Sequence, residues 1–391
     1  MRILILAPHP FYEERGTPIA VDLLLRALTE RGDKVDVLTY HEGANRHYRN
    51  AYIYRIKPVL KVSNIRPGFS WKKLICDMHL FVSFIGRMRK DSYDVVHAVE
   101  ESAFMAMLLR PLYSSLFVFD MDSSMATQLV DQYRFLRPLG GVFRFLESLP
   151  IRFADAVVPV CDALADQVRK YRGNDIVVLK DVSLVSEESK LGTVEQVRGE
   201  QGKSKKVVMY IGNLERYQGV DLLLESFALV TRHCRDVRLV VIGGRSEDID
   251  KYRTQSQVLG IGETVAFLGR KPVSDIGHYM KQADILVSPR IQGVNTPMKV
   301  YSYLHSGRSV LATRLPTHTQ VISEDFAVLA DPEPSAFASA MMKLLEDDCL
   351  RSRLGAKAFD FIEREHSYEV FRARLFELYH RLEKSIMATH F

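Results

Sequence analysis

Short apolar runs alternate regularly along this chain with longer segments whose apolar residues recur at helical spacing. Apolar runs predict strands at residues 3–7, 34–39, 51–56, 93–97, 116–120 and 156–159. Segments of helical periodicity lie between several of these runs, at residues 19–30, 71–89 and 100–109. Strands that alternate with helices form parallel βαβ units, so the sequence predicts an α/β fold with a doubly wound sheet.

The same alternation starts again after residues 183–204, which are polar, charged and poor in apolar periodicity. Further strands are predicted at residues 205–212, 237–244, 264–270, 284–289 and 309–314. A chain of 391 residues is long enough for two domains. We therefore predict two Rossmann-like domains, residues 1–185 and 205–366, which face each other across a central cleft. The last helix, about residues 367–391, either crosses back onto the first domain or packs on the second.

Composition and cysteine placement narrow the classes of function. The formal net charge of +5 is too small to indicate nucleic-acid binding, but it suits an anionic ligand. Cys76, Cys161, Cys234 and Cys349 form no CxxC pair and no Cys/His cluster, which predicts free thiols in a reducing cytoplasm and no metal site. The N-terminal run lacks the features of a signal peptide, and no apolar run reaches the roughly 18 residues of a membrane span.

Three predicted strand-to-helix loops have residues that suit phosphate. Free N–H groups and the dipole at a helix start both favour an anion, and glycine lets the backbone approach it closely. In the first loop Gly16 is followed by Thr17, a capping residue, and by Pro18, which suits the first helical position. No GxGxxG motif is present, which argues against a dinucleotide cofactor. An ordinary helix start explains this loop equally well.

The second loop runs from Gly212 to Gly219 and has three polar side chains, Asn213, Arg216 and Gln218. Its position between a predicted strand and a predicted helix suits phosphate binding. A solvated turn explains the same residues.

The third loop begins with Arg290 at the end of a predicted strand. Asn295 and Thr296 precede Pro297, so we expect Thr296 to cap the next helix and Pro297 to be its first residue. A cation in the first turn of a helix, here Lys299, is unfavourable for the helix dipole unless an anion binds there. This loop is the strongest of the three candidates for a diphosphate site.

Taken in order, several segments resemble the group 1 glycosyltransferases, also called glycosyltransferase family 4, which have the GT-B fold. They are YIGNLERYQGVDLLLESFA, RLVVIGG, VAFLGR, ADILVSPR, NTPMKVYSYLHSGRSVLAT, the LLEDDCLRSRLG tail, the RGTP loop, DVVHAVEESA and ADAVVPVCDAL. The resemblance covers nearly the whole chain. It implies a nucleotide-sugar donor held mostly by the second domain, and transfer with retention at the anomeric carbon without an obligatory metal or a cofactor.

The resemblance also implies roles for single positions. Gly16 and Thr17 match the glycine loop that approaches the donor phosphates, and Arg270 matches the place where main chain meets the nucleobase. Asn295, Thr296, Pro297 and Met298 match the stretch whose amides meet the diphosphate and the sugar.

The chain departs from the family's pattern in its charged donor contacts. Asn213 and Gln218 stand where the family has a basic pair, so we expect Arg216 and Lys299 to carry the diphosphate between them. Val294 and Ser302 stand where the family has two glutamates that contact sugar and ribose, and Ser302 is retained as a candidate contact. A branch of the family with a YQG loop and a TPxKxYxYL helix is similar to this chain. These departures fit either a different set of contacts to the donor or an enzyme of reduced activity.

Candidate catalytic residues lie in the first domain. Asp122 stands where the family has a histidine near the reacting centre, and it either hydrogen-bonds a sugar or acceptor hydroxyl or caps the following turn. His97 and Glu100 lie past the end of another predicted strand and are also candidates. No Ser-His-Asp order, Walker loop or zinc motif is present.

Two segments of the first domain are basic and amphipathic. Residues 132–153 interleave arginines with phenylalanines, and Trp71 and two lysines open another such helix. Faces of this kind contact anionic lipid as a peripheral membrane surface, or they form a solvated basic edge.

These observations favour a cytoplasmic hexosyltransferase that is retaining and metal-independent. It would move a sugar from a nucleotide-sugar donor to a glycan, lipid-linked or other hydroxyl acceptor, as in polysaccharide biosynthesis. The main alternative is a non-catalytic GT-B protein that binds a nucleotide or glycan as a partner subunit, and a sugar-nucleotide epimerase of the same fold is a third. The base, the sugar and the acceptor stay open.

Overall fold

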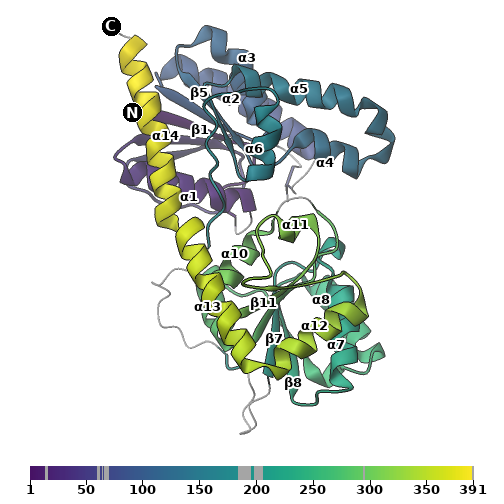
Figure 1. Ribbon diagram of the computed structural model, residues 1–391. Helices are drawn as coiled ribbons and strands as arrows, with labels where there is room; N and C mark the ends of the chain where they lie inside the picture. The colour runs from purple at the N-terminus through teal and green to yellow at the C-terminus, as the bar shows by residue number, and fades with distance from the viewer. Residues whose placement is uncertain are drawn as a thin grey trace. The chain divides into compact units, whose positions relative to one another are not determined.

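The computed structural model describes residues 1–13, 16–59, 62–63, 65, 70–183, 195–197, 206–293 and 296–389, apart from the side chains of residues 131, 132, 134 and 389. The chain divides into two compact units (Figure 1). Unit 1 comprises Met1–Asp181 and Glu369–Phe391, and unit 2 comprises Val182–Tyr368. Each unit contains a six-stranded sheet whose paired strands are parallel, which confirms the predicted α/β architecture.

The strands of unit 1 are β1 (Arg2–Ala7), β2 (Lys34–Thr39), β3 (Ala51–Arg55), β4 (Val95–Val99), β5 (Leu116–Met121) and β6 (Ala156–Pro159). They lie in the order β3-β2-β1-β4-β5-β6. Most of them are continuous apolar runs, because a parallel sheet is covered by helices on both faces. The order reverses between β1 and β4, and ligands of such sheets bind at the carboxyl ends of the strands near this point.

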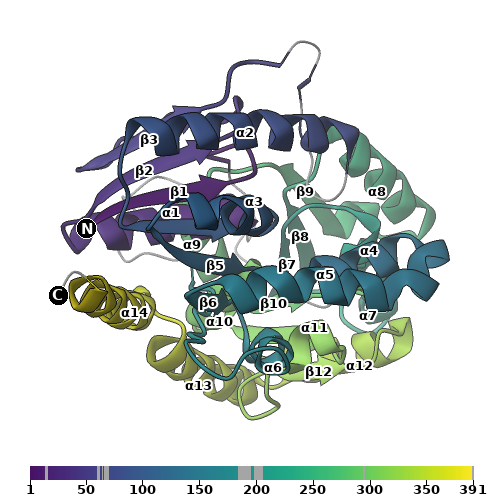
Figure 2. The same cartoon turned by 90° about the horizontal axis from the view of Figure 1, so that it is seen from above.

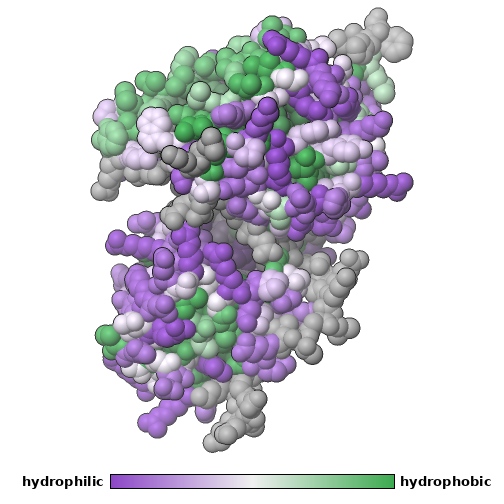
Figure 3. Space-filling model, turned by 180° about the vertical axis from the view of Figure 1, so that it is seen from behind, coloured by the Kyte–Doolittle hydropathy of each residue, from purple (hydrophilic) through white to green (hydrophobic). Residues whose placement is uncertain are grey.

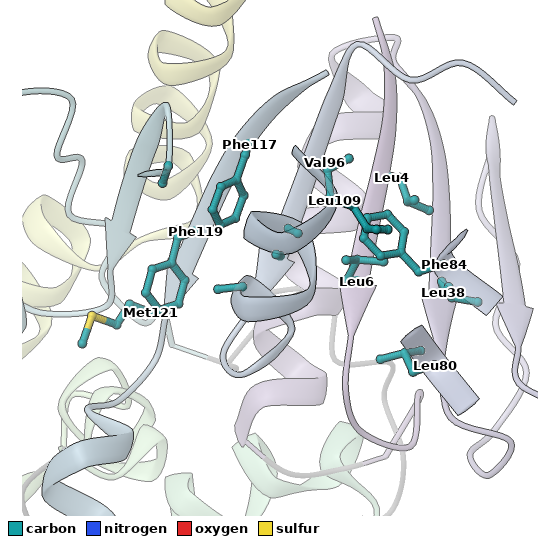
Figure 4. Close-up of a cluster of buried hydrophobic side chains, with 14 of the residues drawn as sticks. Leu4, Leu6, Leu38, Leu80, Phe84, Val96, Leu109, Phe117, Phe119 and Met121 are labelled. Carbon is teal, nitrogen blue, oxygen red and sulfur yellow. The ribbon is translucent and has the colours of Figure 1, made fainter. Parts of the chain in front are cut away.

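The helices of unit 1 are α1 (Gly16–Glu30), α2 (Trp71–Lys90), α3 (Ser102–Leu109), η1 (Arg110–Leu112), α4 (Met125–Gln132), η2 (Arg134–Leu139), α5 (Gly140–Phe153), α6 (Asp162–Arg169) and α14 (Tyr368–Thr389). Figure 2 shows α2, α3 and α5 side by side over one face of the sheet. Beneath them lies the apolar core of Figure 4, in which Leu6 and Phe119 from strands lie with Phe84 and Leu109 from helices. These three helices therefore form one layer of the unit.

The last helix, α14, packs on unit 1. Leu378 and Tyr379 are at most 2% exposed, and Glu383 forms an ion pair with Arg31 at 3.3 Å. Figure 1 shows this helix running alongside the strands of the unit. Of the two placements that the sequence left open, the structure has the return to the first unit.

His97 is enclosed by α14, which bears on its predicted catalytic role. Strand β4 continues to Val99, two residues beyond its predicted end, so His97 lies inside the strand and is 0% exposed. Its Nδ1 is 2.8 Å from the hydroxyl of Tyr379, and its Nε2 is 3.1 Å from a carboxylate oxygen of Asp120. A ring closed off from solvent cannot contact a sugar, so the structure corrects the prediction and gives His97 a structural contact with α14.

The strands of unit 2 are β7 (Lys206–Ile211), β8 (Val237–Ile242), β9 (Val265–Gly269), β10 (Ile285–Ser288), β11 (Ser309–Thr313) and β12 (Val328–Ala330). They lie in the order β12-β11-β10-β7-β8-β9, so this sheet reverses between β7 and β10. Its helices are η3 (Arg216–Gln218), α7 (Val220–Thr231), α8 (Ser246–Val258), η4 (Gly262–Thr264), α9 (Val273–Gln282), α10 (Met298–His305), α11 (Pro316–Thr319), α12 (Pro334–Glu346) and α13 (Asp348–Glu365).

Most of the predicted linker, residues 183–204, lies outside the described residues. The described part, residues 195–197, packs on unit 2, where Val197 is 4% exposed. The N–H of Val197 donates to the side chain of Gln282 at 2.9 Å, and its carbonyl accepts from Arg238 at 3.2 Å. This short stretch therefore belongs to the surface of unit 2. Among the residues that the structure describes, no helix combines the length and apolar character needed to cross a membrane.

We expect Tyr379→Phe to lower the stability of unit 1 by about 1–3 kcal/mol, the cost of leaving a buried polar group without its partner. The substitution keeps the ring but removes the hydroxyl that meets Nδ1 of His97. Thermal unfolding followed by circular dichroism measures the change. Tyr52→Phe is the matched control, because that side chain is 67% exposed and should lose almost nothing. Equal, small effects of both substitutions would show that this bond does not hold α14 in place.

Candidate functional site

The loops after β7 and β10 lie at the strand reversal of unit 2, where a doubly wound sheet binds its ligands. Gly219 brings the two loops together. Its φ of +73° is left-handed, and a Cβ at this position would lie 1.9 Å from the carbonyl oxygen of Pro289, so only glycine fits. The N–H of Ile291 also donates to the carbonyl of Tyr217 at 3.0 Å. The loop after β7 is therefore fixed against the end of β10.

Lys299, in the first turn of α10, places its ammonium group at this reversal point. The Nζ atom donates to the side-chain oxygen of Gln218 at 2.9 Å and lies 4.1 Å from the ring centroid of Tyr210. A Cβ at Gly212 would come within 3.1 Å of Nζ, so the absence of a side chain there leaves room for the ammonium group. Burial lowers the pKa of Lys299 well below its usual value, and the nearby charge of Arg290 lowers it further. No ion pair joins Lys299 to a carboxylate in the described part of the chain.

Arg290 is the second cation of this site. Its guanidinium lies 5.1 Å from the ring centroid of Tyr217, and its Nε donates to the carbonyl of Gln292 at 2.6 Å. Burial lowers the pKa of Arg290 as well. Two cations that both lose hydration at one place gain most from an anionic partner.

Arg216, which the sequence paired with Lys299, lies elsewhere on the loop. It is exposed, and its charge acts on Tyr252, whose hydroxyl donates to Asp221 at 3.2 Å. The cation whose charge acts on Lys299 is Arg290, and the expected role of Arg216 at the diphosphate stays a prediction.

The other two predicted residues of this loop differ in their exposure. Asn213 is exposed, and its side-chain nitrogen is 3.4 Å from the hydroxyl of Tyr217. Its carbonyl accepts from the hydroxyl of Tyr210 at 2.6 Å. Gln218 is buried and contacts Lys299, so the structure brings Gln218 and Lys299 together as polar partners.

Helix α10 begins one residue later than predicted. Pro297 has extended backbone angles, φ −66° and ψ 132°, so it takes the capping position and Met298 is the first helical residue. Thr296 does not cap the helix, since no side chain does so and its hydroxyl accepts from Gln320 at 2.9 Å. The backbone N–H groups of Met298 and Lys299 are therefore at the helix start, where such groups have no partner within the helix. Asn295 and Val294 lie outside the described residues.

The remaining predicted donor contacts follow other strands or lie on α10. Arg270 follows β9, is exposed, and donates to the carbonyl of Gly244 after β8 at 3.2 Å. Ser302 is 6% exposed and lies on the buried side of α10. The ring of His318, on α11, contacts the hydroxyls of Ser288 at 2.9 Å and Thr313 at 3.0 Å. Burial lowers its pKa to about 4, so its imidazole is neutral near pH 7.

In unit 1, carboxylate side chains lie at the carboxyl ends of the strands. Asp122 follows β5 and Glu100 follows β4; Asp120 acts electrostatically on both, and Asp181 acts on Asp122. Burial raises the pKa of Glu100 and of Asp181 to about 7, and it raises the pKa of Asp122 well above its usual value; neighbouring carboxylates add to each shift. At least part of this cluster therefore holds protons near neutral pH.

Thr17 reaches this cluster from the first loop. Its side chain hydrogen-bonds to Asp122, so the structure brings together two residues that the sequence singled out separately. Helix α1 begins at Gly16, ahead of the predicted start at Pro18, and no atom lies within 4 Å of a Cβ built at Gly16. The cap of α4 is Ser124, which accepts from the N–H of Thr127 at 3.2 Å, so Asp122 does not have that role.

Sequence reasoning missed several members of both sites. Tyr210, Tyr217 and Asp181 were not singled out, and Arg290 was not paired with Lys299. The position of Arg290 directly after a strand at the reversal point was the available signal, but it could be read only once the strand order was known. The described residues contain no group of three or more His, Cys, Asp or Glu side chains arranged to hold a metal ion.

Comparison with known proteins gives the family. Residues 194–361 match the glycosyl transferases group 1, and residues 15–180 match glycosyltransferase family 4, so the two matches together span most of the chain. The chain is 27% identical over 376 residues to the D-inositol 3-phosphate glycosyltransferase of Corynebacterium glutamicum (strain R), covering 90% of this chain and 88% of that protein.

Two solved structures share the fold. Sucrose-phosphate synthase from Thermosynechococcus elongatus superposes with a TM-score of 0.77 at 18% identity, covering 98% of this chain and 99% of that one. Anabaena HepE in complex with UDP superposes with a TM-score of 0.74 at 15% identity, covering 96% and 99%. These likenesses confirm the predicted GT-B fold. With this fold, and with a family match in each half of its sequence, the chain belongs to the group 1 glycosyltransferases of family 4.

Proposed function

We propose that this protein is a retaining hexosyltransferase whose unit 2 holds a nucleotide-sugar donor by its diphosphate. The observation that carries the proposal is the placement of Lys299 and Arg290 at the strand reversal, over the rings of Tyr210 and Tyr217, with Gln218 as a neutral hydrogen-bond partner of Lys299. An anion between them would offset the cost of burying two positive charges side by side. The helix-start N–H groups of Met298 and Lys299 would add donors with partial positive charge.

A nucleoside diphosphate suits the charge and the aromatic side chains of this site. The rings of Tyr210 and Tyr217 lie beneath the two cations, and Gly219 fixes the loop after β7 against the end of β10. Anabaena HepE was solved with UDP and with UDP-glucose, which supports a nucleotide sugar as the donor class. Two cations can neutralise the leaving diphosphate, so we propose that no metal and no cofactor is needed.

We place the acceptor side of the reaction at the carboxylate cluster of unit 1. Asp122 and Thr17 offer a carboxyl group and a hydroxyl that suit the hydroxyls of a sugar or polyol. The relative that acts on D-inositol 3-phosphate supports a hydroxyl acceptor, and a glycan or lipid-linked acceptor has the same reacting group. The free thiols of the chain, including exposed Cys349, support a cytoplasmic location because thiols persist in a reducing compartment.

A non-catalytic GT-B protein that binds a nucleotide is the second candidate. Ser302, which stands where the family has a glutamate, is buried and uncharged, and His97 is enclosed under α14. Binding alone does not separate the two functions. Transfer from a panel of nucleotide sugars to simple glycoside and polyol acceptors does separate them, with EDTA present and the anomeric configuration of the product read by NMR.

We expect Lys299→Ala and Arg290→Ala each to weaken binding of a nucleoside diphosphate by about 1.5–3 kcal/mol, the scale of a hydrogen bond to a charged group. Binding of the bare nucleoside should change much less, because it lacks the phosphates. Isothermal titration calorimetry with UDP, GDP and ADP and their nucleosides measures both. Arg253→Ala removes an exposed cation of α8 and is the control.

Arg216→Ala separates the two assignments of the phosphate. If Arg216→Ala weakens diphosphate binding as much as Lys299→Ala does, and Arg290→Ala has no effect, then Arg216 is the second cation that binds the phosphates. That result would overturn the site described above. Transfer that stops when EDTA is added would contradict the metal-independent mechanism, and an inverted product would contradict retention.

We expect Asp122→Asn to stabilise unit 1 at pH 8 while it reduces transfer. A carboxyl whose pKa is higher in the folded state stabilises that state only at low pH, and this contribution is lost as pH rises toward the folded pKa. The asparagine amide does not ionise, so the variant does not lose stability as the pH rises. Its thermal midpoint should therefore exceed that of the parent by roughly 2 °C or more at pH 8 and differ little from it at pH 4. Asp166→Asn, on an exposed face of α6, is the control. A fall in the midpoint at pH 8 would contradict the shifted pKa.

A further inference from the structure

Exposed hydrophobic side chains concentrate on one part of unit 1. Among the described residues, thirteen of the seventeen large hydrophobic side chains that are exposed belong to α2, α3, η1, η2 and α5. The other four, Tyr52, Val258, Phe359 and Met387, are scattered over four different elements. Figure 3 shows hydrophobic residues gathered over the upper part of the molecule, where these helices lie in Figure 1. Because α2, α3 and α5 form one layer, the exposed groups share one side of the unit.

Helix α2 has two apolar faces, of which the core needs only one. Its inner face buries Cys76, Leu80, Phe84 and Met88. Its outer face carries exposed apolar side chains at helical spacing: Trp71 (74% exposed), Ile75 (40%), Met78 (64%) and Val82 (69%), with Leu74 (39%) beside them. A surface helix whose outer side faces water usually has polar residues at such positions.

The segment from η2 through α5 repeats this arrangement. Its exposed apolar side chains are Phe135, Leu139, Val142, Phe145, Leu146 and Phe153, and Leu108 and Leu112 extend the set onto α3 and η1. Phe135 is 77% exposed and Phe145 58%. We call the outer sides of α2, α3, η1, η2 and α5 together the outer helical face.

The charges of the outer helical face are of one sign. Its exposed charged side chains, among those described, are all basic: Lys72, Arg89, Lys90, Arg137, Arg144 and Arg152. The acidic residues of the same helices point inward. Asp77 is half-buried and bonds to the hydroxyl of Tyr40, and Glu147 is 6% exposed and accepts from Ser124. The face therefore combines exposed apolar groups with positive charge.

We propose that the outer helical face docks on a lipid bilayer that contains anionic lipids. Apolar side chains would enter the boundary between headgroups and acyl chains, and the arginines and lysines would meet the anionic headgroups. Trp71 suits the boundary because an indole ring is amphipathic. A protein partner of acidic character would satisfy the charges, but it would not require thirteen apolar groups spread over five elements.

This surface is also connected to the carboxylate cluster of unit 1. Glu147 of α5 accepts from the hydroxyl of Ser124 at 2.9 Å and from the N–H of Ala126 at 3.2 Å, just after Asp122. Lys73 of α2 forms an ion pair with Glu101, next to Glu100, at 2.5 Å. Docking would therefore place the proposed acceptor side near lipid, which fits a lipid-linked acceptor. Docking itself does not depend on the proposed reaction.

Trp71 makes the test direct, because it is the single tryptophan of the chain. Vesicles of phosphatidylcholine with 30–50% phosphatidylglycerol (about that range suffices for a strongly negative surface) should shift its emission to shorter wavelength and carry the protein down on sedimentation. Vesicles of phosphatidylcholine alone should bind at least about tenfold more weakly, since several basic residues lose their partners. Rising salt should weaken the anionic case.

Matched variants locate the surface. Met78→Ser with Val82→Ser, and separately Arg144→Glu with Arg152→Glu, should each lower vesicle binding by about tenfold or more. The controls are Val258→Ser, an exposed apolar residue of α8, and Arg353→Glu with Lys357→Glu on the exposed side of α13; both should bind vesicles like the parent. Circular dichroism verifies that each variant folds.

Three results would overturn the proposal. They are no binding to anionic vesicles, equal binding to neutral and anionic vesicles, and parent-like binding by both outer-face variants. Analytical ultracentrifugation adds a fourth: a stable dimer that shields Trp71 from a quencher would assign this face to a second copy of the chain. UDP binding by the same variants should equal that of the parent, so failure here leaves the donor site unaffected.

Discussion

The ammonium group of Lys299 is held where a cation loses hydration without gaining a carboxylate from the described residues, and Tyr210, Gln218 and Gly212 of unit 2 surround it. Tyr210 lies under it, the side-chain oxygen of Gln218 accepts a hydrogen bond from it, and the missing side chain of Gly212 leaves it room. Gly219 fixes the loop that carries Gln218 against the end of β10, where Arg290 adds a second positive charge. Such an arrangement costs stability on its own and is favourable when an anion is bound.

The two sheets have the same topology, but different ionisable side chains lie at their carboxyl edges. Unit 2 presents cations from the ends of β10 and α10, and unit 1 presents carboxyl groups from the ends of β4 and β5. The first suits phosphate, and the second suits hydroxyl groups. A doubly wound sheet positions both without special architecture, because its strand ends converge at one edge and its loops are free to vary.

Much of the fold could be predicted from sequence because buried parallel strands are continuous apolar runs. The predicted bounds of β2 and β6 match the structure, and those of β1 differ by a single residue. The errors have physical causes. In β4 the prediction ended at His97, but the strand continues through Ala98 and Val99, so a structural histidine looked like a loop residue. The pairing of Arg290 with Lys299 depends on β7 and β10 being neighbours, which periodicity along the chain does not reveal.

Measuring the pKa of Lys299 shows whether a desolvated cation lies at the strand reversal of unit 2. Reductive methylation with ¹³C-formaldehyde gives each lysine an NMR signal whose position reports protonation, and Lys299→Arg identifies the signal of Lys299. We expect a pKa well below the usual lysine value in the free protein. The pKa should rise when a nucleoside diphosphate is added, and it should stay unchanged when the bare nucleoside is added. An ordinary pKa that stays unchanged when the diphosphate binds would show that Lys299 is not the desolvated cation around which this site is built.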